Sequence, residues 1–351
     1  MATLAAAGLL LGPFLPGSFL SPGLAQAPGE VVTAAAEETV APYSEPTTPC
    51  SVTDARLPEI SGLATSGDTT LAMNDGGDAV TVYVLDAACT VVAERTAAVD
   101  PYDPEDMALA ADGTVWIADT GDNRATRETV ALIALRPDGA AEVFRLSYPD
   151  GAHDSEALLL APDGTPYLVT KEVLGSSGVY RPATALDAGT TVALERVGDL
   201  TLELTGTSGG PVGRAGQLMV TGGAVSADGA AVAVRTYTDV LVWPLAGSDV
   251  AGALATPPAR VALPDSPQGE AVTFAADGRS LVVSGEGLPA AVTVVPAVGA
   301  LAPAAATGPA AVSAQALTED GSTGLSPWTA GLIAAVAAAV LVWTTGKLRR
   351  R

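Results

Sequence analysis

Short apolar runs separated by glycine-containing turns repeat along the middle of the chain. Asp-Gly pairs begin at Asp112, Asp163, Asp228 and Asp277, and each pair stands between two apolar runs rich in β-branched residues. An Asp-Gly pair accommodates the positive φ of a tight hairpin turn, so each one predicts two paired strands. No segment of this region shows a strong helical period, and the pattern therefore favours strands throughout.

A glutamate recurs at a fixed distance from these turns. Eight residues before the turn glycine stand Glu105, Glu156, Thr221 and Glu270, and a fifth unit running from Glu59 to Gly67 keeps the same spacing. The units begin at intervals of 46, 51, 65 and 49 residues. A four-stranded propeller blade takes ~40–50 residues. The longest interval contains the Gly-rich segment 205–217, which we interpret as a loop.

The repeat predicts an all-β fold, a five-bladed β-propeller over residues 50–299. Six blades are the alternative, and a pair of β-sandwiches is a third possibility. The last unit has three good strands and ends near Pro296, so a strand from before Cys50–Leu57, or from Val31–Val40, is expected to close the ring. Residues 28–49 are thus a linker with a possible ring-closing strand. In the unit that begins at Glu105, the strands are expected at Glu105–Ala111, Thr114–Asp119, Thr129–Leu135 and Ala141–Tyr148.

The N-terminal segment is typical of an export signal. Ala5–Leu20 is apolar, and Ala25–Ala27 has the small-x-small pattern of a cleavage site, so residues 1–27 are interpreted as a signal peptide. No Lys or Arg precedes the apolar stretch. Either the true start codon lies upstream or the signal is a weak one.

The C-terminal segment predicts a membrane anchor. Residues 328–345 carry no charge and would span ~27 Å as a helix, close to the thickness of the bilayer core. Trp328 and Trp343 stand at its two ends, and the tail 346–351 contains Lys347 and Arg349–Arg351, which favour the cytoplasmic side. Residues 300–327 form an Ala/Pro/Gly/Ser-rich linker. We therefore expect a single-pass cell-membrane protein with an extracellular propeller and a cytoplasmic tail.

The net charge limits the possible partners of the chain, and the cysteine content predicts a disulfide. The chain has 39 acidic residues against 17 Lys and Arg, for a net charge of −22, which excludes nucleic-acid binding because phosphate backbones require a basic surface. In an oxidising compartment the two cysteines most simply form one disulfide, Cys50–Cys89, although two separate buried thiols remain open. An unknown extracellular ligand or protein is the expected partner besides the membrane.

The propeller geometry gathers charged residues at one end of the central channel. If each recurring glutamate begins an innermost strand, the next strand returns to the same end. That mouth then collects Glu59, Asp75, Glu105, Asp119, Glu156, Lys171, Arg235, Glu270 and Glu286.

Three interpretations of this mouth stay open. In the first, Lys171 and Arg235 neutralise acids in a purely structural salt-bridge network. In the second, the mouth binds a hard cation, possibly Ca²⁺, which takes six to eight oxygen ligands. The candidate ligands are Glu59, Asp75, Glu105, Asp119, Asp122 and Glu156.

The third interpretation is catalytic. Glu270 or Glu286 would activate water, while Lys171 and Arg235 would stabilise developing charge beside a bound Ca²⁺. The run His153–Ser155 does not offer a nucleophile and base, because adjacent residues of an extended chain point to opposite faces. The sequence contains no Gly-rich phosphate-binding loop motif and no His-Glu-x-x-His motif.

Four short motifs resemble the phytase-like esterase and SdiA-regulated β-propeller families, over about residues 49–296. They are Pro58–Ala64 (PEISGLA), Met73–Asp75 (MND), Asp103–Asp106 (DPED) and Trp116–Asp119 (WIAD). The resemblance implies a calcium-supported propeller, with phosphoester or ester hydrolysis in some members. The sequence therefore predicts a membrane-anchored extracellular β-propeller that binds a ligand, cation or partner through an acidic channel mouth. The alternative is a calcium-dependent phosphoesterase or esterase of phytase-like type.

Overall fold

The computed structural model describes residues 43–301. The predicted signal peptide, the predicted membrane-spanning segment 328–345 and the basic tail lie outside these residues. Within 43–301, no helix is both long enough and apolar enough to cross a membrane.

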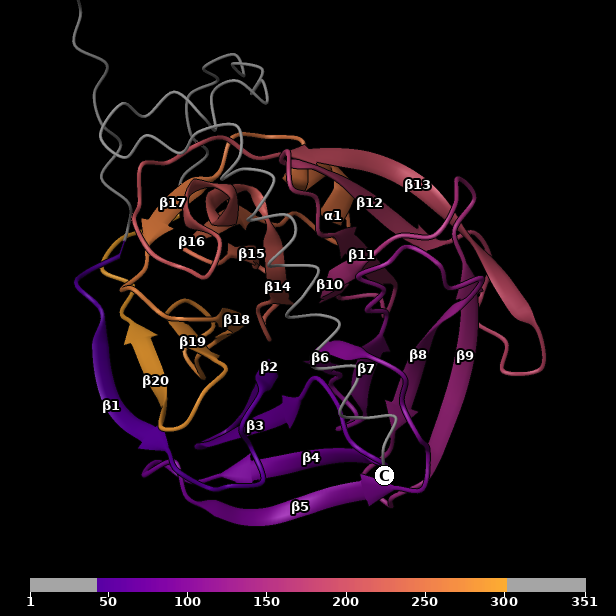
Figure 1. Cartoon of the computed structure of the whole chain (residues 1–351), viewed down its shortest axis with the longest axis horizontal. Coiled ribbons are helices and arrows are strands. Elements are labelled where there is room, and N and C mark those ends of the chain that lie inside the picture. The colour runs from indigo at the N-terminus through magenta and orange to yellow at the C-terminus, as the bar shows by residue number, and fades with distance from the viewer. Residues whose placement is uncertain (1–42, 302–351) are drawn as a thin grey trace, which may run out of the picture. The chain divides into compact units, whose positions relative to one another are not determined.

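Antiparallel sets of four strands surround a central axis (Figure 1). Set 1 consists of β2 (Ile60–Ser66), β3 (Thr69–Asn74), β4 (Val80–Leu85) and β5 (Val91–Ala97). Set 2 consists of β6 (Pro104–Leu109), β7 (Val115–Asp119), β8 (Val130–Leu135) and β9 (Ala141–Ser147). Set 3 consists of β10 (Ser155–Leu160), β11 (Pro166–Thr170), β12 (Ser176–Pro182) and β13 (Thr191–Thr201). The outer strands β9 and β13 pair in parallel, which joins sets 2 and 3 into one eight-stranded sheet.

The remaining strands form two more sets. Set 4 consists of β14 (Val220–Val225), β15 (Ala231–Thr236), β16 (Asp239–Pro244) and β17 (Ala259–Ala262). Set 5 consists of β18 (Gly269–Phe274), β19 (Leu281–Gly285), β20 (Ala290–Val295) and β1 (Thr47–Val52). Two short helical elements occur in connections, the 3₁₀ helix η1 (Gly213–Leu218) and α1 (Val250–Leu254). Asp249 caps α1 by accepting the amide N–H of Gly252. The segment 205–217, expected to be a loop, contains most of η1.

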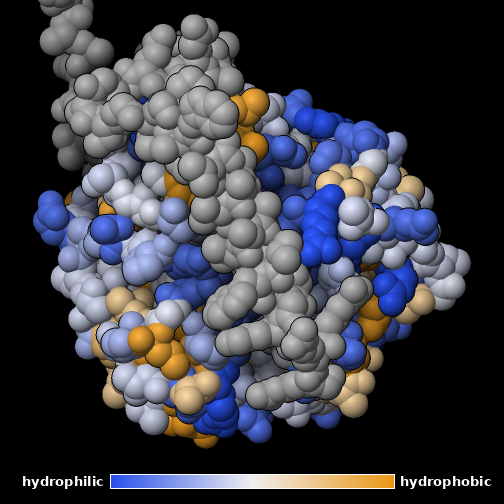
Figure 2. Space-filling model, viewed as in Figure 1, coloured by the Kyte–Doolittle hydropathy of each residue, from blue (hydrophilic) through white to orange (hydrophobic). Residues whose placement is uncertain are grey.

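The innermost strands β2, β6, β10, β14 and β18 contact one another in order, and β18 contacts β2, so the ring is closed and the fold is a β-propeller. The apolar core lies between neighbouring sets. Met73 of set 1 packs with Met107 and Ile117 of set 2, for example, and all three are buried. Burial of each such side chain contributes about 1.5–3 kcal/mol. Outside the grey region, the face drawn in Figure 2 is largely hydrophilic, with apolar residues in small separate patches.

The Asp-Gly pairs form the turns between the first and second strands of sets 2 to 5. Gly113 has φ +85° and its amide N–H donates to the carbonyl of Ala110, while Asp112 accepts the amide N–H of Thr114. A side chain at the glycine position would be strained at this φ. The four strands predicted for the unit at Glu105 agree with β6–β9 to within two residues at every end.

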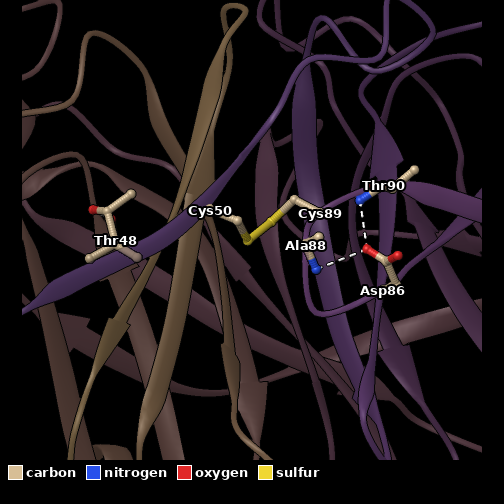
Figure 3. Close-up of a disulfide and its surroundings, with 7 residues drawn as sticks. Thr48, Cys50, Asp86, Ala88, Cys89 and Thr90 are labelled. Atoms are coloured by element: carbon tan, nitrogen blue, oxygen red, sulfur yellow. Dashed lines mark hydrogen bonds between the residues drawn. A yellow bond between two sulfur atoms is a disulfide. The ribbon is translucent and has the colours of Figure 1, made fainter.

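The ring closes through an N-terminal strand and a disulfide. Strand β1 pairs antiparallel with β20, which makes it the outer strand of set 5. Cys50 in β1 forms a disulfide with Cys89 in the turn between β4 and β5 of set 1 (Figure 3). In that turn Asp86 accepts the amide N–H groups of Ala88 and Thr90. The disulfide therefore joins the last set covalently to the first.

Candidate metal centre

Each innermost strand carries an irregularity in its pairing near its first residue. The register skips Glu105 in β6, Glu156 in β10 and Thr221 in β14. It also skips Ser61 in β2, and in β18 the break includes Glu270. A β-bulge leaves its extra residue unpaired and changes the direction of its side chain. The recurring glutamates are thus bulged residues at the start of the innermost strands.

The first set departs from the alignment expected from the sequence. Its bulged residue is Ser61, whereas Glu59 corresponds to Asp103 and Asp154 of the next two sets. The carbonyls of these three acids accept the amide N–H groups of Asp75, Gly121 and Lys171 respectively. The difference arises because β2 and β3 are joined by only two residues, Gly67 and Asp68. The residue eight positions before Gly67 is therefore Glu59, two positions before the bulged residue Ser61. Glu59 is also exposed.

Three carboxylates from sets 2 and 3 converge at the mouth. Glu105, Asp154 and Glu156 each place one oxygen within 4.8 Å of the others. Glu105 and Glu156 are buried, at 6% and 3% exposure, and Asp154 is partly buried. The Nζ atom of Lys171 lies 2.7 Å from Oε1 of Glu156. One ammonium group therefore faces a cluster of three carboxylates.

Burial and neighbouring acids disfavour the ionised form of the carboxyl groups in this cluster. Burial raises the pKa of Glu105 well above its usual range, and the charges of Glu156 and Asp103 raise it further. Burial likewise raises the pKa of Glu156, although the ammonium of Lys171 opposes the shift. Burial lowers the pKa of Lys171, but the charges of Glu156 and Glu270 outweigh this effect and raise it well above its usual range. These carboxylates must be protonated, paired or bridged by a cation.

A second group of acids comes from sets 1 and 5. Burial raises the pKa of Asp75 to about 8, helped by the charges of Glu286 and Glu59. Burial also raises the pKa of Glu286 to about 7, and Glu270 adds to the shift. Glu270 is 4% exposed, and its buried Oε2 atom has no hydrogen-bond partner among residues 43–301. The charges of Lys171 and Arg235 oppose the rise for Glu270, and the pKa of Asp75 and of Glu286 stays raised.

Asp119 and Asp122 already have protein partners. Asp119 Oδ1 accepts the amide N–H of Asp103 and pairs with Arg127 Nη2 at 3.1 Å. Asp122 Oδ2 accepts the amide N–H groups of Thr126 and Arg127, which organises the loop that carries that arginine. Both carboxylates hold the β7–β8 connection in place and are less available to a cation than Glu105 and Glu156.

Arg235 lies inside the propeller wall and not at the mouth, unlike the expectation from the sequence. It stands one residue before the end of β15, where it pairs with Gly222, and is 2% exposed. Its Nη1 donates to the carbonyls of Ala271 and Ser284 in set 5. Burial lowers its pKa to about 10, which the charge of Glu270 opposes. Thr236 faces Val220 in set 4 as Thr170 faces Ser155 in set 3, so Tyr237, and not Arg235, takes the position of Lys171.

Asp103, Asp154 and Arg127 are mouth residues that the sequence pattern did not single out. Burial raises the pKa of Asp103 to about 6, and the charge of Asp154 contributes. The Nζ atom of Lys171 lies 5.2 Å from the centroid of the Tyr237 ring. Asp103 and Asp154 each stand two residues before a recurring glutamate, a signal present in the sequence. No periodic signal marks Arg127, because it lies in a connection.

The run His153–Ser155 holds no catalytic pair. His153 Nε2 lies 3.1 Å from Asp150, and Ser155 Oγ lies 2.6 Å from the hydroxyl of Tyr148. The serine and histidine therefore have different partners, as expected for neighbours on an extended chain.

Fold and site together define an all-β propeller with a carboxylate-lined mouth. No family model matches the chain, and no curated protein matches its sequence. Among solved structures, a gluconolactonase from Xanthomonas campestris is similar over 68% of this chain and 71% of that one, at 15% identity and TM-score 0.40. A catalytically inactive virginiamycin B lyase from Staphylococcus aureus, with quinupristin, is similar over 68% and 66%, at 10% identity and TM-score 0.34. Neither similarity assigns an activity to this chain, and the resemblance to phytase-like and SdiA-regulated propellers stays a prediction.

Proposed function

We propose that this protein is a five-bladed β-propeller whose acidic mouth binds a divalent cation, Ca²⁺, as a structural or ligand-recruiting centre. Each set of four strands is one blade. The observation that carries the proposal is the convergence of Glu105, Asp154 and Glu156, with oxygens within 4.8 Å of one another. Two oxygens that bind one Ca²⁺ at about 2.4 Å each lie no more than about 4.8 Å apart.

The chemistry of the donors favours a hard ion. The cluster offers only carboxylate oxygens, the chain has a single histidine, and both cysteines are in the disulfide. Zinc and other soft or borderline ions prefer imidazole and thiolate ligands, whereas Ca²⁺ prefers oxygen. The unpartnered Oε2 of Glu270 is a further acceptor at the same mouth.

Equilibrium dialysis with Ca²⁺, followed by elemental analysis, tests this proposal. The parent chain is expected to retain at least one ion, and Glu105→Gln and Glu156→Gln are expected to lose it. Glu142→Gln is the matched control, because Glu142 pairs with Arg136 on the exposed surface of set 2. Ca²⁺ binding that is absent from the parent chain, or equal in all four proteins, would reject the proposal.

Metal-assisted ester or phosphoester hydrolysis is a second candidate function. Asp75 and Glu286, with pKa values of about 8 and 7, hold or release a proton near neutral pH, as a general acid or base must. A bound cation would supply polarisation of the substrate oxygen. Hydrolysis of short acyl and phosphomonoester substrates that is lost in Glu286→Gln, while Ca²⁺ binding is retained, is the expected signature. Arg235 is not expected to take part, because its Nη1 is bound to the carbonyls of Ala271 and Ser284.

We further propose that the protein is exported and anchored in the cell membrane with its propeller outside. The apolar segments 5–20 and 328–345, and the bases that follow the second one, support this topology. A chain that ends before Trp328 is expected in the medium. Retention of that shortened chain by membranes would contradict the topology.

A further inference from the structure

Exposed apolar side chains gather on the face of the propeller that carries the acidic mouth. Among the described residues, seven large apolar side chains are markedly exposed. Val92 lies on the outer strand β5 and Val298 follows β20, away from the mouth. The other five lie in connections at the mouth end of the strands: Tyr102, Val173, Leu174, Val212 and Leu288.

Two of these connections lie next to the charged residues of sets 2 and 3. Tyr102 is 72% exposed, and its ring lies 4.5 Å below the guanidinium of Arg127, which pairs with Asp119. Leu174 is 51% exposed and follows Lys171 in the β11–β12 connection, as does Val173. The exposed apolar side chains of these two connections therefore lie next to charged residues of the mouth.

The other two connections continue this rim on sets 4 and 5. Leu288 stands two residues after Glu286 in the β19–β20 connection. Val212 precedes η1, and a Cβ placed on Gly216 would meet the side chains of both Val212 and Tyr237 within 3.5 Å. The ring of Tyr237 in turn faces Lys171. We call these five residues the apolar rim.

The mouth inside the apolar rim has more carboxyl groups than cationic groups. Arg127 pairs with Asp119 and Lys171 with Glu156, while Arg235 is bound to backbone carbonyls inside the wall. One Ca²⁺ would leave further carboxylates uncompensated. Those facing the mouth are Glu59, Asp75, Asp103, Glu105, Asp154, Glu156, Glu270 and Glu286.

We infer that this face docks a peptide segment of a partner protein that presents a lysine or arginine between apolar side chains. The cationic group would enter the acidic mouth, and the flanking apolar groups would cover the rim. Interfaces combine a charge-complementary centre with apolar contacts, and the rim extends over four of the five sets, so a single small amine would leave most of it uncovered. This inference goes beyond cation binding, because the acids exceed the bases with or without one Ca²⁺.

Fluorescence anisotropy with a labelled seven-residue peptide tests the inference. This peptide has a central arginine flanked by two leucines on each side. The comparison peptide is identical except that glutamate replaces the central arginine. The arginine peptide is expected to bind at least about tenfold more tightly, with affinity that falls as salt is added. Tyr102→Ser and Leu174→Ser are expected to weaken binding by about tenfold each. Val92→Ser, an exposed apolar residue outside the rim, is expected to bind as the parent does.

Equal binding of the two peptides, no binding at millimolar concentration, or equal affinities in all three variants would overturn the inference. Sedimentation of the propeller with phosphatidylserine vesicles, lost in Leu174→Ser while the peptide does not bind, would replace the partner by a lipid surface and so also reject it. The assay is run in Ca²⁺ and in chelator. Peptide binding without Ca²⁺ retention in dialysis would reject only the cation proposal.

Discussion

Lys171 Nζ lies 2.7 Å from Oε1 of Glu156, a residue that places one carboxylate oxygen within 4.8 Å of oxygens of Glu105 and Asp154. The ammonium group occupies a position that a divalent cation would compete for. Lys171 is therefore expected to stabilise the metal-free mouth and to oppose metal binding.

Substitution Lys171→Met separates these two effects. Without its ammonium partner, the buried carboxylate of Glu156 is left unpaired, which is expected to cost about 3 kcal/mol in chelator. Ca²⁺ affinity is expected to rise by about tenfold, because a competing positive charge is gone. Melting in chelator and calorimetric titration with Ca²⁺ measure the two quantities. A loss of affinity in Lys171→Met would show that the lysine assists binding.

Asp106 ties three innermost strands together. Its carboxylate, fully buried beside the mouth, accepts the amide N–H groups of Met107, Leu158 and Gly223. Asp106→Ala would leave these three donors unsatisfied, with an expected loss of about 3 kcal/mol or more in urea unfolding. Asp112→Ala is the control, since Asp112 accepts one amide N–H group in an exposed turn, and a smaller loss is expected there. Equal losses of stability in Asp106→Ala and Asp112→Ala would contradict the role of Asp106 in joining the three strands.

The disulfide is expected to stabilise the closed ring. Cys50 and Cys89 are 39 residues apart in the sequence, and a cross-link over such a loop contributes about 3–4 kcal/mol in the chain-entropy model. Unfolding of Cys50→Ser/Cys89→Ser in urea is compared with that of the oxidised parent. Two free thiols in a non-reduced digest of the parent, or identical unfolding midpoints, would contradict this prediction.

Stability of the metal-free protein is expected to fall as the pH rises. The pKa of Asp75 is about 8 in the folded protein, above its ordinary value of 3.8, and the pKa of Glu286 is about 7, above 4.5. Between these values the folded chain holds protons that the unfolded chain has released, so stability falls from about pH 4 to about pH 8. In chelator, the melting midpoint is expected to be lower at pH 8 than at pH 5 by about 5 °C or more. Asp75→Asn should reduce this difference.

Turn chemistry and strand alternation allowed the propeller to be predicted from the sequence. The Asp-Gly turns and β-branched runs gave the strands of set 2 to within two residues. The bulged glutamates Glu105, Glu156 and Glu270 were found because they keep a constant distance from turns of equal length. Glu59 was misaligned with them because the turn at Gly67 is shorter.

Other parts of the site depend on contacts that no local pattern encodes. The register of β15 gives Tyr237 the position of Lys171 and sets Arg235 two residues earlier in the strand. Arg127 reaches Asp119 from a connection whose path is set by Asp122, and neither residue follows the repeat. Contacts made by residues of the connections depend on the folded backbone, so only the structure shows them.

Thermal melting in Ca²⁺ and in chelator tests the central claim most directly. A site that binds only the folded state stabilises it by about 2.7 kcal/mol at a hundredfold excess of Ca²⁺ over Kd. The parent chain is therefore expected to melt about 5–10 °C higher in Ca²⁺ than in chelator, with the shift abolished in Glu105→Gln/Glu156→Gln and kept in Glu142→Gln. Equal midpoints of the parent chain in Ca²⁺ and in chelator would contradict cation binding at the mouth.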